Sequence, residues 1–358
     1  MNEPPKTPLE PVAVGIDSLY LSVFIDGIGV DWERLKFEKE RLRVSPGEDY
    51  AEFEFGGERF ALHRGGRKPY SFVLSNRAFT LSLSERLQPR CHAQFSSELL
   101  WHERLEEALK RFHAMLANIG TRETRPEVIS RVDAAFDFAV GNPEFRTEHF
   151  VSDARKDGTW REDGTPQSFQ FGKDDVVCRV YDKVAEIEQQ SGKDWLFDIW
   201  GVREGVWRCE FQIRGPRLKQ AGIATIGQLR GYFPGLVRHL AKHHTSLRIP
   251  TRDRNRSRWP RHPMWEGLIA AADQLLAAPE SPPPPLLTGI EYPLDRQPVS
   301  LEGDLKAIAA LLSRNCPERP VTLGQLLKWL PRMMRRRHSP ELWKADVIAK
   351  IRKRELGL

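Results

Sequence analysis

A tyrosine stands between two cations in the segment VVCRVYDKVAEIEQQ, which begins at Val176. The first half of the segment alternates like a strand and the second half has helical spacing. Because alternate strand residues share a face, Arg179, Tyr181 and Lys183 are expected on one side. A phenol has a pKa near 10, so only about one part in a thousand is phenolate at pH 7. Nearby cations favour the phenolate, and the segment therefore predicts a nucleophilic tyrosine assisted by Arg179 and Lys183.

Two further segments, RVDAAFDF and VWRCEFQIR, also have one apolar face and one face of ionisable groups. The charged residues of those faces are Arg131, Asp133, Asp137, Arg208, Glu210 and Arg214. Carboxylate oxygens suit a hard divalent cation such as Mg²⁺ or Mn²⁺, which makes Asp133, Asp137 and Glu210 the candidate metal ligands. The arginines are candidate phosphate contacts. For any one strand taken alone, a solvated face with salt bridges is the alternative.

Together these groups are of the types that phosphoryl transfer requires. That reaction depends on positioning and electrostatics more than on covalent chemistry of the protein. A divalent cation would polarise a phosphodiester and hold its geometry. The cations would bind phosphate, and Tyr181 would attack it. Two more acids are candidates, Asp17 in the first predicted strand and Glu186 after Tyr181, although Glu186 is equally explained as a solvated helix residue.

The chain of 358 residues is longer than most single domains, and its composition changes along its length. Residues 1–12 are polar and proline-rich and predict a disordered tail. Residues 13–277 predict an α+β domain with a largely antiparallel sheet and packed helices. Residues 278–299 contain APESPPPPLLTG and predict an extended linker. Residues 300–358 predict a small, all-helical, basic module.

Within the main domain, short alternating segments predict strands over most of the first hundred residues. One helix is expected at residues 98–118, because its apolar residues form a broad stripe. Residues 152–167 contain many breakers and predict a polar loop. Residues 217–244 are again helical in pattern, with a break expected at Pro234.

Neither a membrane span nor a signal peptide is predicted, because no apolar run approaches the roughly 18 residues needed and the start is polar. The four cysteines form no CxxC pair. They are interpreted as reduced residues of a cytoplasmic protein.

The segments RVDAAFDF, FQFGKDDVVCRVYDKVAE and WRCEFQIRG, in this order, resemble the replication initiation factor (Rep_trans) family of rolling-circle plasmid and phage initiators, which is related to MobT-type relaxases. GIDSLYLSV and CHAQFSSELLW are also similar to that family, so the resemblance covers roughly residues 14–215. It implies a metal-dependent endonuclease that nicks one strand of origin DNA through Tyr181. It further implies a 5′-phosphotyrosyl intermediate, with a divalent ion held by acids. The histidine–hydrophobic–histidine motif of other initiators is absent from the sequence.

Basic residues are concentrated in two regions, in a chain of net charge +6. The segment 248–263 contains Arg252, Arg254, Arg256, Arg258 and Trp259, which predict phosphate contacts with a base stacked on the tryptophan. From residue 314 to the end, twelve Lys and Arg residues, among them Arg335, Arg336 and Arg337, accompany only four acids. A DNA-binding module or a docking module for a host helicase would explain this tail, and a solvated basic helix is the alternative.

Two other functions remain open beside replication initiation on double-stranded origin DNA and its nicked strand. One is a relaxase that uses the same chemistry to transfer a mobile element. The other is an origin-binding protein without catalysis. A homodimer is compatible with each of these functions. A tyrosine recombinase, which RHLAKHH at residues 238–244 suggests, is disfavoured because Tyr181 lies in a strand context.

Overall fold

The structure is a computed structural model. It describes residues 7–45, 48–162, 164–277, 322–328, 343–345 and 347–348. The chain divides into two compact units, residues 1–286 and 287–358. In the second unit, residues 323–328 are helical. The predicted linker at 278–299 and the residues Arg335, Arg336 and Arg337 lie outside the described residues, so their roles stay predictions.

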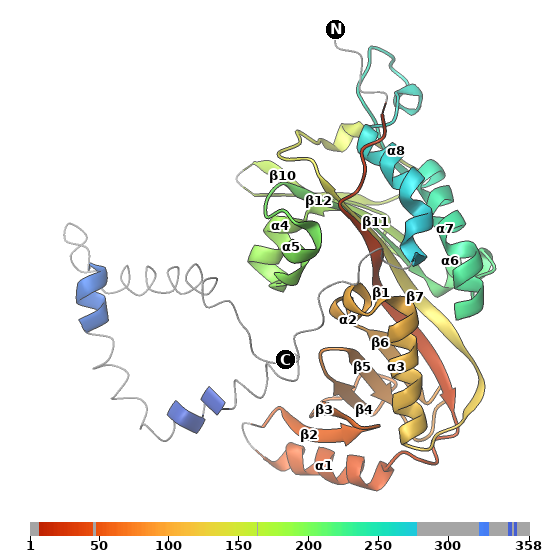
Figure 1. Cartoon of the computed structure of the whole chain (residues 1–358), viewed down its shortest axis with the longest axis vertical. Coiled ribbons are helices and arrows are strands. Elements are labelled where there is room, and N and C mark those ends of the chain that lie inside the picture. The colour runs from red at the N-terminus through yellow and green to blue at the C-terminus, as the bar shows by residue number, and fades with distance from the viewer. Residues whose placement is uncertain are drawn as a thin grey trace. The chain divides into compact units, whose positions relative to one another are not determined.

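The described part of the first unit is built on one antiparallel sheet of eleven strands (Figure 1). In hydrogen-bonded order the strands are β2 (Tyr50–Phe55), β3 (Glu58–His63), β4 (Phe72–Ser75), β5 (Phe79–Leu83), β6 (Cys91–Phe95), β1 (Ala13–Ile25), β7 (Glu123–Ala139), β12 (Val206–Arg214), β11 (Val176–Asp182), β10 (Thr165–Phe171) and β9 (Asp157–Glu162). The short strands β8 (Phe150–Ser152) and β13 (Thr245–Leu247) pair with each other. The long strands β1 and β7 thus join an N-terminal half-sheet to a C-terminal half-sheet.

The helices of this described part pack on the sheet from both sides. They are α1 (Trp32–Val44), α2 (Ser97–His102), α3 (Arg104–Asn118), α4 (Lys183–Glu186), α5 (Trp195–Trp200), α6 (Gly215–Gln220), α7 (Ile226–His243) and α8 (Pro263–Ala270). Single turns of other helix types are η1 (Thr147–His149), η2 (Ile187–Ser191), η3 (Arg256–Arg258) and η4 (Ala271–Leu276). The α4 helix starts directly after Tyr181 because the side chain of Asp182 accepts a hydrogen bond from the amide of Ala185 and caps it.

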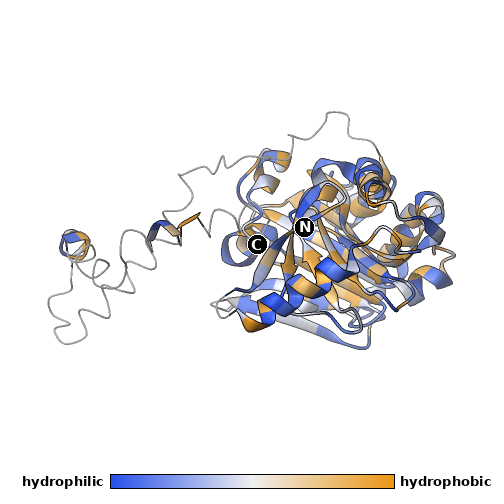
Figure 2. Ribbon diagram, turned by 90° about the horizontal axis from the view of Figure 1, so that it is seen from below, coloured by the Kyte–Doolittle hydropathy of each residue, from blue (hydrophilic) through white to orange (hydrophobic). Residues whose placement is uncertain are grey.

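The two faces of the sheet differ in chemistry, as strand alternation predicts. The apolar face packs against α1, α3, α6, α7 and α8 in one large core, with buried residues such as Phe95, Phe136 and Phe211. The polar face is covered over its C-terminal half by α4, η2 and α5, through a smaller core that includes Ala135 and Trp200. Figure 1 shows α6–α8 and α4–α5 on opposite sides of the strands, and Figure 2 shows hydrophobic residues (orange) gathered between helices and sheet.

This architecture confirms the predicted α+β class with a largely antiparallel sheet. The strand-to-helix change around Tyr181 is also confirmed, since β11 is followed at once by α4. In the described part of the chain, no helix is both long enough and apolar enough to cross a membrane.

Several local predictions are wrong. The helix expected at residues 98–118 is two helices, because Arg104 adopts a left-handed backbone conformation with φ 60° between α2 and α3. Pro234 lies inside α7 without ending it, and the break falls earlier, between α6 and α7. There the side chain of Thr225 starts α7 in a capping box with Gln228.

Two segments predicted to be irregular are ordered parts of the first unit. The polar loop expected at residues 152–167 contains β9 and the start of β10. Residues 7–12 of the expected tail lie along the body: the amide of Leu9 donates to the carbonyl of Pro263 (3.0 Å), and that of Val12 donates to the carbonyl of Asp137 (2.8 Å). Leu9 and Val12 also pack against the cores, which gives an apolar reason for this attachment. The helix α1 has no counterpart among the predicted elements.

Candidate active site

The register of three neighbouring strands brings the predicted residues together on the polar face. On β11 and β12, Tyr181 is opposite Arg208, and Arg179 is opposite Glu210. On β12 and β7, Arg208 is in turn opposite Asp137. Directly opposed side chains in an antiparallel pair lie about 5 Å apart at Cβ, so these groups interact across the strands.

The centre of the site is the hydrogen bond from the hydroxyl of Tyr181 to Oε2 of Glu210, at 3.0 Å. The other oxygen of Glu210 accepts a hydrogen bond from Nη1 of Arg179 at 3.1 Å. Arg179 also donates to the side-chain oxygens of Gln170 (3.1 Å) and Gln212 (3.3 Å), which hold its guanidinium in place. Glu210 is therefore positioned to accept the phenolic proton, and Arg179 orients that carboxylate.

The electrostatic state of Tyr181 differs from the sequence-based expectation. Burial and the charge of Glu210 raise the pKa of the phenol well above its ordinary value, although Arg208 acts in the opposite direction. The lowering of the phenol pKa expected from Arg179 and Lys183 is thus not found in the protein alone, because burial and the nearby acids raise that pKa instead. The phenol is held neutral and hydrogen-bonded until its proton is removed.

Lys183 lies beside Tyr181, as predicted, with Nζ 5.6 Å from the centre of the tyrosine ring. It is only 2% exposed and forms an ion pair with Glu186. Burial lowers the pKa of its ammonium group, with a further contribution from Arg208. The charge of Lys183 therefore sits in a poorly solvated position, where it acts strongly on a neighbouring phenolate.

Asp133 of β7 is, beside Glu210, a second acid on the polar face, and it is 1% exposed. Burial and the charge of Glu210 raise the pKa of its carboxyl to about 7, against the effect of its ion pair with Arg131. Gln212, opposite Asp133 on β12, is 2% exposed, and its side-chain nitrogen has no hydrogen-bond partner in the described part of the chain. A cation would offset the repulsion between the carboxylates of Asp133 and Glu210. A phosphate oxygen would accept a hydrogen bond from the unpaired side-chain nitrogen of Gln212.

Asp137 and Arg208 have a structural role that corrects their predicted ones. Arg208 is 0% exposed and binds both oxygens of Asp137, through Nε at 2.6 Å and Nη2 at 2.8 Å. The indole of Trp200 donates to the same carboxylate at 2.8 Å. With its oxygens satisfied, Asp137 does not fit a metal ligand, and Arg208 is too deeply buried to contact DNA.

Asp17 belongs to this same buried network. Its carboxylate accepts hydrogen bonds from Arg208 (2.7 Å), Trp101 (2.9 Å) and Ser97 (2.8 Å). Burial alone would raise the pKa of Asp17, but the charge of Arg208 and of nearby lysines lowers it below its usual range. Asp17 is thus a fixed anion under the site rather than an exposed ligand.

Tyr181 opens onto a cleft of about 370 Å³ between the polar face and α4–η2. The residues that line it include Trp160, Ser168, Gln170, Arg179, Tyr181 and Glu186. Trp160 was not among the predicted site residues, because it lies in the segment predicted to be a loop. It is 54% exposed beside the nucleophile candidate, which suits stacking with a base.

No complete metal cage is present: the described residues hold no group of three or more His, Cys, Asp or Glu side chains placed to bind a metal ion. A Mg²⁺ ion, however, commonly uses one or two carboxylates together with waters and substrate phosphates. Asp133 and Glu210 can form that smaller donor set if the ion displaces Arg131 and Arg179, which bind their oxygens in this structure. Asp137 is instead held by Arg208 and Trp200 and is 0% exposed.

The predicted DNA-binding residues occupy different surroundings. Arg214 is exposed and pairs across strands with Arg131 on the polar face. In the basic loop Arg252 and Arg254 are exposed, whereas Arg256 donates to the carbonyl of Glu148 (3.0 Å). Arg258 lies 3.8 Å from Asp253, and the indole nitrogen of Trp259 donates to the carbonyl of the same residue (2.7 Å), so the loop is braced by its own contacts.

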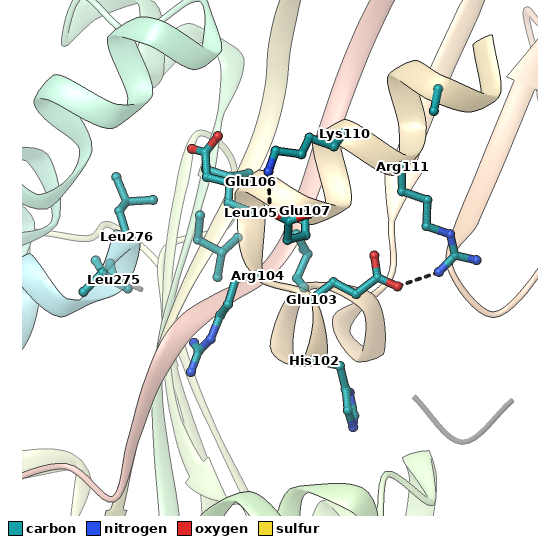
Figure 3. A pocket seen from close by; sticks show the side chains of 14 residues that line it. His102, Glu103, Arg104, Leu105, Glu106, Glu107, Lys110, Arg111, Leu275 and Leu276 are labelled. Atoms are coloured by element: carbon teal, nitrogen blue, oxygen red, sulfur yellow. Dashed lines mark hydrogen bonds and ion pairs between the residues drawn. The ribbon is translucent and has the colours of Figure 1, made fainter. Parts of the chain in front are cut away.

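A larger cavity of about 860 Å³ lies between α3 and η4 (Figure 3). Four of its charged groups form pairs within the lining, Lys110 with Glu107 (2.5 Å) and Arg111 with Glu103 (2.7 Å). None of the predicted site residues lines it. It is therefore separate from the candidate active site.

Comparisons with known proteins give a structural likeness alone. No family model and no curated protein matches the chain. Among solved structures, a rolling circle replication initiator protein from Geobacillus stearothermophilus is similar, with 17% sequence identity and a TM-score of 0.44. The match covers 74% of this chain and 99% of that one.

Proposed function

We propose that the chain is a rolling-circle replication initiator that nicks one DNA strand by attack of Tyr181 on a phosphodiester. The observation that carries the proposal is the hydrogen bond of Tyr181 to Glu210, at the wall of a cleft that also exposes Arg179 and Trp160. A half-buried phenol with an acceptor, two cations and an open approach is the arrangement that nucleophilic catalysis requires.

In the proposed step, the phenolic proton passes to Oε2 of Glu210 as the phenolate oxygen attacks phosphorus. The bond from phosphorus to the 3′-oxygen breaks, and that oxygen takes a proton from solvent. The products are a 5′-phosphotyrosyl ester and a free 3′-hydroxyl. Lys183 stabilises the phenolate, and Arg179 binds a phosphate oxygen while it orients Glu210.

A divalent ion, when bound, would neutralise charge on the phosphate and fix its geometry. Asp133 and Glu210 are the residues that would hold it. Gln212 has a free donor beside them, which can bind a phosphate oxygen. Arg214, Arg252 and Arg254 would contact the DNA backbone outside the cleft.

The test is a covalent adduct on a denaturing gel. The full chain is incubated with Mg²⁺ or Mn²⁺ and single-stranded or supercoiled DNA that carries a candidate origin. The expected result is a protein–DNA adduct that Tyr181→Phe abolishes while DNA binding survives. Tyr232→Phe, at an exposed tyrosine on α7, is the matched control and should leave the adduct intact.

An adduct that persists in Tyr181→Phe would remove Tyr181 as the nucleophile. The choice of DNA also separates the two uses of this chemistry. Cleavage at a replication origin supports the initiator, and cleavage only at a transfer origin supports the relaxase alternative.

A further inference from the structure

The polar face of the sheet continues beyond the active site onto β1 and β6, where it carries a row of flat side chains. We define the aromatic shelf as Tyr20, Tyr70, His92 and Arg131. The ring centres of Tyr70 and His92 are 6.2 Å apart, and those of His92 and Tyr20 are 5.8 Å apart. The guanidinium carbon of Arg131 lies 4.9 Å from the centre of the Tyr20 ring. All four side chains are partly exposed.

Strand register explains why these groups share a face. Tyr20 of β1 is opposite Arg131 of β7 on one side and opposite Gln94 of β6 on the other. His92 lies two residues from Gln94 on β6 and therefore points the same way. Tyr70 comes from the loop between β3 and β4 and reaches His92 from there. The helices α1 and α3 pack on the opposite, apolar face, so they leave the shelf uncovered.

The chemistry around the shelf favours an anionic, flexible partner. The polar-face positions of β4, β5 and β6 are neutral: Val73, Ser75, Thr80, Ser82, His92 and Gln94. Exposed cations lie at both ends of the row. Arg67 and Lys68 are near Tyr70 at one end, and Arg214 is beside Arg131 at the other. None of these three cations has an ion-pair partner among the residues that the structure describes. The acid beside the shelf, Asp133, is bound by Arg131, and Glu52 and Glu54 of this face are on the distant edge strand β2.

The orientation of the rings favours unpaired over paired DNA. The ring planes meet at 81° between Tyr20 and His92 and at 42° between Tyr70 and His92, so they do not form a parallel stack like that of duplex bases. In a duplex, moreover, the base faces are already stacked on each other. Rings on a sheet face with cations around them are suited to a single strand whose bases are splayed out.

The shelf is connected to the active site through one residue. Arg131 stacks on Tyr20 and also binds the carboxylate of Asp133. From β11, which carries Tyr181, to β6 is four strand spacings, or about 19 Å at roughly 4.8 Å each. We propose that the aromatic shelf binds the unpaired DNA strand next to the cleavage point and guides it across β1, β7 and β12 toward Tyr181. The direction of the strand rests on the proposed nicking function, whereas the binding of single-stranded DNA does not.

The test measures binding of the full chain to a fluorescein-labelled single-stranded 20-mer and to the corresponding duplex by fluorescence anisotropy, in EDTA. The double variant Tyr20→Leu/Tyr70→Leu should bind the single strand about 10- to 100-fold more weakly and the duplex within about twofold of the parent. Tyr20→Phe/Tyr70→Phe keeps the rings and should bind like the parent. Tyr232→Leu, on the far side of the sheet, is the matched control.

Retained duplex binding shows that the leucine variant is folded. Equal loss of both affinities, or no loss of single-strand affinity, would overturn the proposal. A second measurement needs no variant: photocrosslinking of the parent to a 5-iodouracil-substituted single strand should label Tyr20, Tyr70 or His92, and labelling confined to other elements would also overturn it. If the shelf variants lose single-strand binding but no Tyr181 adduct forms, the shelf stands and the nicking function fails.

Discussion

The hydroxyl of Tyr181 donates to Oε2 of Glu210 at 3.0 Å, across the pair of strands β11 and β12. A carboxylate at this position has two opposing effects. It raises the pKa of the phenol, and it is also the group to which the phenolic proton can move. Glu210 therefore disfavours the phenolate at rest, and in the proposed reaction it would act as the base when a phosphate is in place.

Glu210→Gln is expected to slow adduct formation by about 100- to 10,000-fold, the usual contribution of a positioned base. The amide keeps a hydrogen-bonding group near Tyr181 but does not take up a proton. Single-turnover cleavage rates measure the effect, with DNA binding as the control. A rate within a few-fold of the parent would show that the proton leaves by another route.

Asp133→Asn is expected to stabilise the metal-free protein at pH 8. The pKa of Asp133 is raised to about 7 in the folded chain, against about 3.9 in an unfolded one. Between these values the folded state keeps a proton that the unfolded state has released, so stability falls as pH rises through this window. The variant does not titrate and should be more stable than the parent by about 2–4 kcal/mol at pH 8, since each pKa unit corresponds to about 1.4 kcal/mol. Urea denaturation in EDTA at pH 8 and pH 4 measures the gain, which should vanish at pH 4.

The same variant should lose any stabilisation by Mg²⁺ or Mn²⁺ that the parent shows, because Asp133 is one of the two carboxylates assigned to the ion. A less stable Asp133→Asn at pH 8 would mean that the ion pair with Arg131 outweighs burial.

Asp137→Asn makes the same chemical change four residues along β7 and should have the opposite sign. Asp137 is fully buried and receives two hydrogen bonds from Arg208, so its replacement leaves the buried guanidinium with only the carboxylate of Asp17 as an ion-pair partner among the described residues. The expected loss is about 3–5 kcal/mol at pH 7, measured by urea denaturation. A loss below about 1 kcal/mol would argue against this ion pair as a support of the site.

Arg252→Ala/Arg254→Ala should weaken DNA binding and flatten its salt dependence by about 0.9 log units for each phosphate that is no longer neutralised. Both arginines are exposed, with no ion pair to the described residues. Arg43→Ala/Arg230→Ala removes two arginines that are paired with Glu40 and Glu106, and is the charge-matched control. An unchanged slope in the first variant would place the basic loop away from DNA.

The common face of Asp133, Tyr181 and Glu210 was predictable because strict alternation along each strand assigns a side chain to a face. Which side chains lie opposite one another on neighbouring strands was not predictable. Whether Asp137 lies opposite Arg208 depends on register, and a single sequence does not specify register between segments about 70 residues apart. Two groups assigned to metal and DNA thus form a buried ion pair.

The packing of α4, η2 and α5 on the polar face explains why the pKa of Tyr181 differs from the sequence-based expectation. An alternating polar face is typical of a solvated sheet, but these elements bury half of it and so raise the pKa of Tyr181. Trp160 was missed because glycine and aspartate near it are typical loop breakers. The Asp-Gly pair at residues 163–164 between two short alternating runs is a hairpin signal that could have indicated its strand.

The place of Tyr181 within the sheet has a mechanical consequence. Its strand is hydrogen-bonded along both edges, to Ser168 of β10 and to Arg208 of β12 at the level of the tyrosine itself. If DNA becomes joined to Tyr181 as proposed, tension on that DNA would act on a strand anchored from both sides and would be shared across several ladders of hydrogen bonds. An attachment point on an edge strand or a loop would peel away under the same load.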